Sequence, residues 1–172
     1  MRKKRILAVS ESPLLSTGYG RYTENLLKKL HDTGKYDITL LASYCDSRDG
    51  RLAQFPWYTI GNNPLNPEEE KIYNSHPQHQ LGSFRFEQVA IQAMPDIVFD
   101  FRDHWYFDYQ ESSILRSNYG WVVSPTVDAA PQKQQWLYTF SRADKVLTYT
   151  DWGADTLKEA GLTNVVGTAQ LG

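Results

Sequence analysis

The chain has 172 residues, of which 41% are hydrophobic and 22% charged, with a net charge of −2. This length suits one domain with a real core, and the near-balanced charge argues against a broad basic surface for nucleic acid. No apolar run approaches the roughly 20 residues that a membrane span needs. The single cysteine, Cys45, has no partner for an internal disulfide. This favours a reducing compartment, and we therefore expect a cytoplasmic protein.

The first thirty residues contain the pattern around which the rest is interpreted. Arg2 to Arg5 is interpreted as a solvated lead-in to the first strand or as a weak attraction to anionic lipid headgroups. Residues 6–9 form a short apolar run, typical of a strand buried on both faces. A polar loop with two glycines, residues 10–20, leads into residues 21–30, where apolar side chains recur at helical spacing. Strand, glycine loop and helix in this order are typical of the start of a doubly wound α/β domain.

Strand and helix patterns then alternate along the chain. Strands are predicted at residues 37–44, 55–60, 97–101, 121–124, 144–149 and 164–167, and helices at 81–94, 109–115, 131–142 and 151–160. Residues 62–80 contain three prolines and look the least ordered. Because alternation implies parallel strands joined by right-handed crossovers, we predict one α/β domain over residues 1–172. Its fold class is a Rossmann-like three-layer αβα domain with a mainly parallel sheet.

Four loop segments are expected to meet at one edge of this sheet, because ligands bind outside the carboxyl ends of parallel strands. They are residues 16–20, 102–105, 125–128 and 149–153. The two glycines of the first segment let backbone amides approach a phosphate at a helix N-terminus. A dinucleotide-binding oxidoreductase is disfavoured. Thr23 stands where the fingerprint needs Gly or Ala, and the glycines lie well beyond the strand.

The second segment joins a cation, an anion, an imidazole and an indole in Arg102, Asp103, His104 and Trp105. An aromatic face beside hydrogen-bonding groups suits a sugar or polyol. The alternative is an Arg–Asp pair that fixes the loop, with Trp105 as packing. His104 is interpreted as a general base, a ligand of an acceptor hydroxyl or a structural residue. Asp128, at the next strand end, has either a binding or a loop-capping role.

No metal site is predicted from the sequence. His76 and His79 have a spacing that can hold a metal on a helix. Pro77 lies between them, however, and no carboxylate is near in the sequence. Both features argue against a metal there.

These residues resemble the N-terminal half of a GT-B-fold glycosyltransferase of the family 4, retaining, nucleotide-sugar-dependent type. Four motifs match in order: Ser16 to Arg21, Pro95 to Trp105, Pro125 to Ala129 with Pro131 and Trp136, and Ala143 to Gly161. Two positions depart from the family pattern. Arg102 replaces a glycine before Asp103, and Ala129 replaces a glycine after Asp128.

The resemblance implies an acceptor-side wall of a catalytic cleft. The expected catalytic residues are Asp103 and His104, and the expected substrate-binding residues are Gly18, Tyr19, Gly20, Arg102, Trp105, Asp128 and Tyr149. In this family a second domain holds most of the nucleotide-sugar donor, and the sequence ends where the linker to that domain would begin. We therefore expect the C-terminal domain to be absent, the chain alone to hold no cofactor and to be inactive, and a separate chain or domain to complete the site.

The implied partners are a sugar or glycan acceptor and that second half, with no nucleic acid and no membrane span. An alternative function is a non-catalytic Rossmann-like module that binds a sugar or nucleotide, or that docks to another protein. The two hypotheses differ in whether the chain needs a second half for chemistry.

Overall fold

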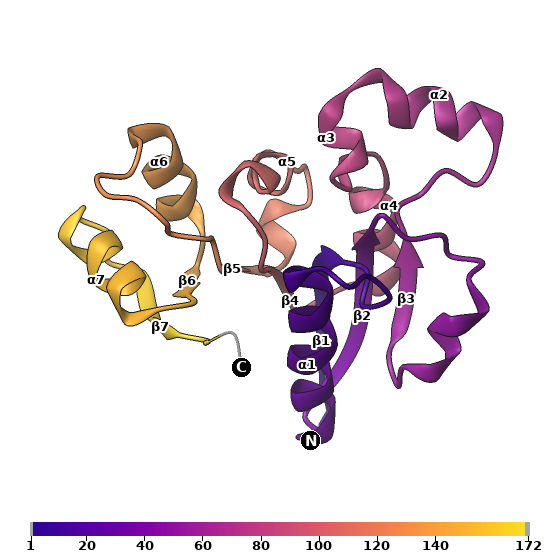
Figure 1. Cartoon of the computed structure of the whole chain (residues 1–172), viewed down its shortest axis with the longest axis horizontal. Coiled ribbons are helices and arrows are strands. Elements are labelled where there is room, and N and C mark those ends of the chain that lie inside the picture. Colours follow the sequence, from indigo (N-terminus) through magenta and orange to yellow (C-terminus); the bar gives the residue numbers. More distant parts are fainter. Residues whose placement is uncertain (1, 171–172) are drawn as a thin grey trace.

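Strand β1 (Lys4–Glu11) lies inside the sheet and pairs in parallel with β2 (Tyr36–Ser43) and β4 (Ile97–Asp100). The computed structural model describes residues 2–170 and shows seven strands in the order β3-β2-β1-β4-β5-β6-β7 (Figure 1). The other strands are β3 (Tyr58–Gly61), β5 (Gly120–Val123), β6 (Lys145–Thr148) and β7 (Val165–Thr168). All pairs are parallel, so the predicted sheet is confirmed.

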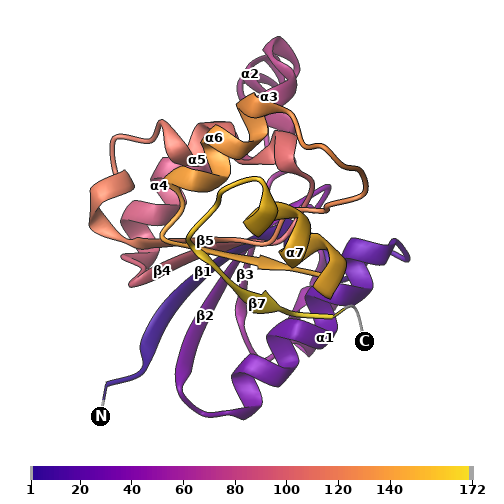
Figure 2. The same cartoon turned by 90° about the vertical axis from the view of Figure 1, so that its left-hand side faces the viewer.

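Helices cover both faces of this sheet. The longer ones are α1 (Gly18–Asp32), α4 (Ser83–Ala93), α6 (Gln134–Arg142) and α7 (Asp151–Glu159). Shorter turns are η1 (Gly50–Gln54), η2 (His104–Tyr106), α5 (Asp108–Glu111) and η3 (Arg116–Asn118). Figure 2 shows α1 on one side of the sheet and α4, α5 and α6 on the other, which confirms the three-layer architecture. Within residues 2–170, none of the helices combines the length and the apolar character needed to cross a membrane.

The alternation of side chains along β1 explains the two halves of the core. Leu7 and Val9 pack on the face covered by α4, beside Phe86. Ile6 and Ala8 belong to the cluster on the α1 face. Because both faces of the strand are covered, an uninterrupted apolar run was the correct sequence signal for it.

Residues 62–80, predicted to be the least ordered, contain two helices, α2 (Pro67–Ser75) and α3 (Pro77–Gln80). The side chain of Asn66 caps α2 by accepting hydrogen bonds from the amides of Glu68 and Glu69. None of the residues of α2 is buried, and Figure 1 shows it projecting from the body of the domain. Capping therefore defines this helix, and a search for apolar periodicity misses it.

Candidate functional site

The strand order reverses between β1 and β4, where crossovers leave in opposite directions. Loops that follow the carboxyl ends of such strands diverge and open a crevice, which is where ligands bind in doubly wound folds. Here the loop of residues 12–17 follows β1, and residues 101–103 follow β4. The expected site therefore lies beside the strand-order reversal, where ligands bind in doubly wound folds.

Tyr19 links three of the four predicted segments. Its phenol oxygen lies 2.7 Å from Asp103 Oδ1, to which it donates, and 2.5 Å from Thr126 Oγ1. Burial and the neighbouring Asp103 carboxylate both raise the pKa of Tyr19, so its hydroxyl stays protonated. Among residues 2–170, no group bonds Asp103 Oδ2, and the residue is partly exposed. The arrangement fixes one carboxylate oxygen of Asp103 and leaves the other without a hydrogen bond from residues 2–170.

His104 packs against two indole rings, Trp105 edge-on and Trp136 at a tilt. Its ring centroid is 3.5 Å from that of Trp136 and 4.6 Å from that of Trp105. Burial lowers the pKa of His104 despite the nearby carboxylates of Asp103 and Asp128, so the imidazole is neutral at neutral pH. Trp105 is 51% exposed and offers its ring to solvent beside this cluster. A neutral imidazole next to an open indole can accept a proton from a sugar hydroxyl while the sugar ring stacks.

Arg102 has a different position from the predicted one. Its side chain is completely buried and forms an ion pair with Asp100, not with Asp103. The same guanidinium donates to Ser43 Oγ (2.9 Å) and to the carbonyl of Leu81 (2.8 Å). Its nitrogens therefore bond to groups of β2, of β4 and of the chain before α4. An Arg–Asp ion pair of the expected kind exists, with Asp100 as the acid, and Arg102 ties the end of β4 to β2 and to the chain before α4.

Tyr149 is also mostly buried. Its hydroxyl donates to the carbonyl of Phe101 over 2.6 Å, and its ring meets Tyr22 edge-on. Burial raises the pKa of Tyr149, with Tyr19 and Tyr22 adding to the effect. It holds the end of β4 in place, and its contact with a substrate stays a prediction.

The two glycines that the sequence placed in the first loop lie in the first turn of α1 and differ in surroundings. A side chain at Gly18 would meet nothing within 4 Å. A Cβ at Gly20 would lie 2.4 Å from the carbonyl oxygen of Leu15, so Gly20 is needed for the loop to fold against α1. Thr17 caps α1 and donates to Glu11 Oε2 over 2.6 Å. This carboxylate beside the helix N-terminus disfavours a second anion there, so the predicted phosphate approach is weakened.

Several site residues were not singled out from the sequence. Thr126 bonds Tyr19, and Trp136, noted only as a motif match, packs against His104 at a tilt. Lys133 Nζ lies 4.8 Å from the ring of Trp136 and extends this cluster. Asp128, which the sequence did predict, is exposed and lies close enough to favour protonation of His104. Among residues 2–170, no group of three or more His, Cys, Asp or Glu side chains could hold a metal ion.

No protein-family model matches the sequence, and no curated protein matches it either. Solved structures do match. MnaA of S. aureus, solved with UDP, has a TM-score of 0.65 at 17% identity over 98% of this chain and 44% of its own. The chain has the fold of one GT-B half. Sucrose-phosphate synthase from Thermosynechococcus elongatus has a TM-score of 0.63 at 14% identity, over 98% of this chain and 47% of its own.

The fold of the chain also resembles that of WaaB, a lipopolysaccharide outer core galactosyltransferase, with a TM-score of 0.58 at 10% identity. That alignment covers 95% of this chain and 44% of WaaB. The chain thus spans about half the length of these three structures. At such identities the likeness establishes the fold, and function must be argued from the site itself.

Proposed function

We propose that the chain is the acceptor-side half of a nucleotide-sugar-dependent glycosyltransferase of the retaining, family 4 type. The observation that carries this proposal is the convergence of Tyr19, Asp103 and Thr126 at the strand-order reversal, beside the exposed ring of Trp105. Indole faces stack on sugar rings, and the free oxygen of a carboxylate can accept a hydrogen bond from a sugar hydroxyl.

In the proposed reaction, the acceptor hydroxyl oxygen bonds to the anomeric carbon as that carbon separates from the diphosphate of the donor. Asp103 orients the hydroxyl through its free Oδ2, and the neutral ring of His104 lies beside it to accept or relay the proton. Trp105 fixes the plane of the acceptor sugar. In this proposal a second domain holds the donor, and the carboxylate of Glu11 beside the N-terminus of α1 supports it by disfavouring a diphosphate there.

Binding by the chain itself tests this proposal. Saturation-transfer NMR with a panel of mono- and disaccharides is expected to show acceptor binding that Trp105→Ala and Asp103→Asn each weaken. Tyr58→Ala is the matched control, since Tyr58 is exposed but lies at the amino end of β3. UDP and UDP-sugars are expected to bind weakly. Binding of NAD in preference to every sugar would refute the proposal, and so would a Tyr58→Ala effect equal to that of Trp105→Ala.

Epimerisation of a nucleotide-sugar is the second candidate. It is favoured by neighbours such as the UDP-GlcNAc 2-epimerase of Neisseria meningitidis bound to UDP-GlcNAc. An epimerase needs no separate acceptor. Tight UDP-GlcNAc binding by the chain, with no sugar of the panel bound, would support this candidate over transfer.

A further inference from the structure

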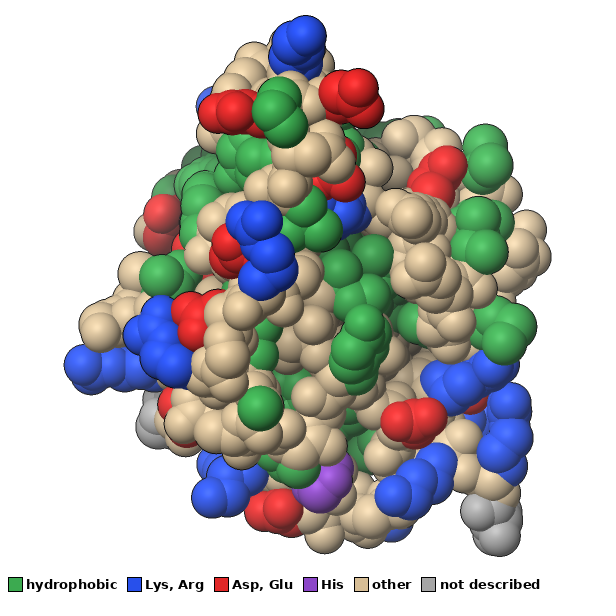
Figure 3. Space-filling model, turned by 90° about the vertical axis from the view of Figure 1, so that its right-hand side faces the viewer, with side chains coloured by type: hydrophobic (Ala, Val, Ile, Leu, Met, Phe, Trp, Pro, Cys, Tyr) green, Lys and Arg blue, Asp and Glu red, His purple; other side chains and the backbone are tan. Residues whose placement is uncertain are grey.

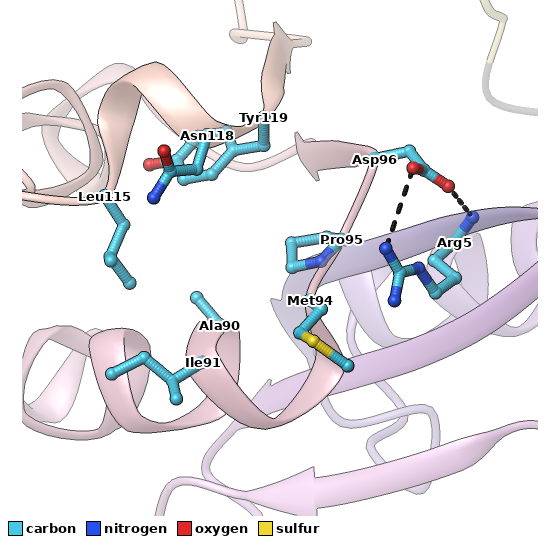
Figure 4. A pocket seen from close by; sticks show the side chains of 9 residues that line it. All are labelled: Arg5, Ala90, Ile91, Met94, Pro95, Asp96, Leu115, Asn118 and Tyr119. Atoms are coloured by element: carbon cyan, nitrogen blue, oxygen red, sulfur yellow. Dashed lines mark hydrogen bonds and ion pairs between the residues drawn. The ribbon is translucent and has the colours of Figure 1, made fainter.

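The edge of the sheet opposite the candidate site carries its own surface features. A hollow of about 390 Å³ lies at the amino ends of β4 and β5, between the end of α4 and the chain around η3. Figure 4 shows Ala90, Ile91 and Met94 on one side of it and Leu115 and Tyr119 on the other. This hollow shares no residue with the predicted sugar site.

Two exposed aliphatic side chains line this hollow, and a third is the chain neighbour of a lining residue. Ile91 and Met94 are each 61% exposed, and Ile114, next to Leu115, is 81% exposed. Met94 caps α4 with a left-handed backbone (φ 43°), a conformation that L-residues rarely adopt. Large aliphatic groups gathered in this way on a surface usually mark an interaction site.

A basic surface adjoins these aliphatic groups. Arg2, Lys3, Lys4 and Lys35 line a second hollow of about 610 Å³, in which no carboxylate takes part. Asp96, which lines the first hollow, pairs with Arg2 of the second hollow (2.7 Å) and with Arg5 (3.8 Å), so the two hollows are neighbours. Figure 3 shows Lys and Arg side chains gathered at the lower right, beneath hydrophobic ones.

The charge of this region differs in sign from that of the whole chain. Five basic side chains and one carboxylate line the two hollows, whereas the chain carries a net charge of −2. The single carboxylate, Asp96, is already paired, and the pKa of Asp96 is lowered by its bond to the Arg5 amide and by the two arginines. The lysines remain available to an anionic partner.

We propose that this edge, defined by Arg2, Lys3, Lys4, Lys35, Ile91, Met94 and Ile114 and called here the amino-end surface, binds the face of a membrane that contains anionic lipids. Basic groups beside exposed aliphatic ones match a layer of anionic headgroups above acyl chains. The carboxyl-end crevice would then point away from the bilayer. The proposal does not depend on the glycosyltransferase assignment.

Sedimentation with vesicles tests the amino-end surface. The chain is expected to bind vesicles of phosphatidylcholine and phosphatidylglycerol in equal parts, and to stay in solution with phosphatidylcholine alone. Neutralising two basic groups in Lys3→Gln/Lys4→Gln should lower the partition coefficient roughly 30-fold. Ile91→Ser/Met94→Ser should lower it as well, because it removes the aliphatic contacts.

Matched controls lie on α2, whose Lys71 and Ile72 are exposed on the projecting part of the domain. Lys71→Gln and Ile72→Ser should leave vesicle binding unchanged. The proposal is overturned if the chain ignores anionic vesicles, or if the controls reduce binding as much as the amino-end variants. A dimer seen by light scattering and lost in Ile91→Ser/Met94→Ser would instead assign the surface to a second copy.

Discussion

Replacing Gly20 with alanine tests how the first loop is built. The new Cβ would lie 2.4 Å from the carbonyl oxygen of Leu15 and 2.9 Å from that of Ser12. Both are backbone atoms, so relief requires the loop or α1 to shift. Overpacking of this kind costs about 1 to 3 kcal/mol, and the better helix propensity of alanine returns up to about 1 kcal/mol. Because both clashing atoms belong to the backbone, we place the overpacking cost at about 2 to 3 kcal/mol and expect a net loss of about 1 to 2 kcal/mol.

Gly18→Ala is the matched control, since it places the same methyl group in open space two residues earlier in the same helix. It should leave stability unchanged or raise it by up to about 1 kcal/mol. Urea unfolding followed by circular dichroism gives both values. For a domain of this size, the loss in Gly20→Ala corresponds to about 2 to 8 °C in Tm. Equal midpoints for the two variants would refute the close packing of the loop on α1.

Three further predictions concern buried polar groups. Arg102→Met leaves the buried Asp100 carboxylate without its cation and should lower the free energy of unfolding, measured in urea, by about 3 to 5 kcal/mol. Arg48→Met removes the cation of an exposed pair and should change this free energy little. Similar urea midpoints for the two variants would contradict the buried network. Burial raises the pKa of Tyr22 from 10.0 to about 12, so as the pH rises the unfolded chain loses this proton before the folded chain does. The free energy of unfolding should therefore fall between about pH 10 and 12, and Tyr22→Phe should lessen that fall. Burial lowers the pKa of His104, so the contribution of its neutral ring to the stability of the fold is present above pH 6.5 and is lost below it. An NMR titration midpoint above 6.5 for His104 would show that the ring is not buried as described.

The candidate site shows why local patterns identify segments and not side-chain partners. The sequence placed Asp103 and Tyr19 in loops at the same sheet edge, and the structure joins them over 2.7 Å. Arg102 was assigned to the same site because it adjoins Asp103 in sequence. Successive residues of an extended chain point to opposite sides, so Arg102 turns inward to Asp100 while Asp103 remains partly exposed.

The sequence by itself determined the αβα class, the parallel sheet and the loops that meet at its carboxyl edge. Those features follow from the period of apolar residues and from glycine and proline signals, which are local. Only the tertiary structure decided that Thr126 reaches Tyr19, that Trp136 packs against His104, and that the basic start of the chain lies beside Met94. These contacts join residues that are far apart in the chain, and their geometry is set by crossovers and by packing against neighbouring strands.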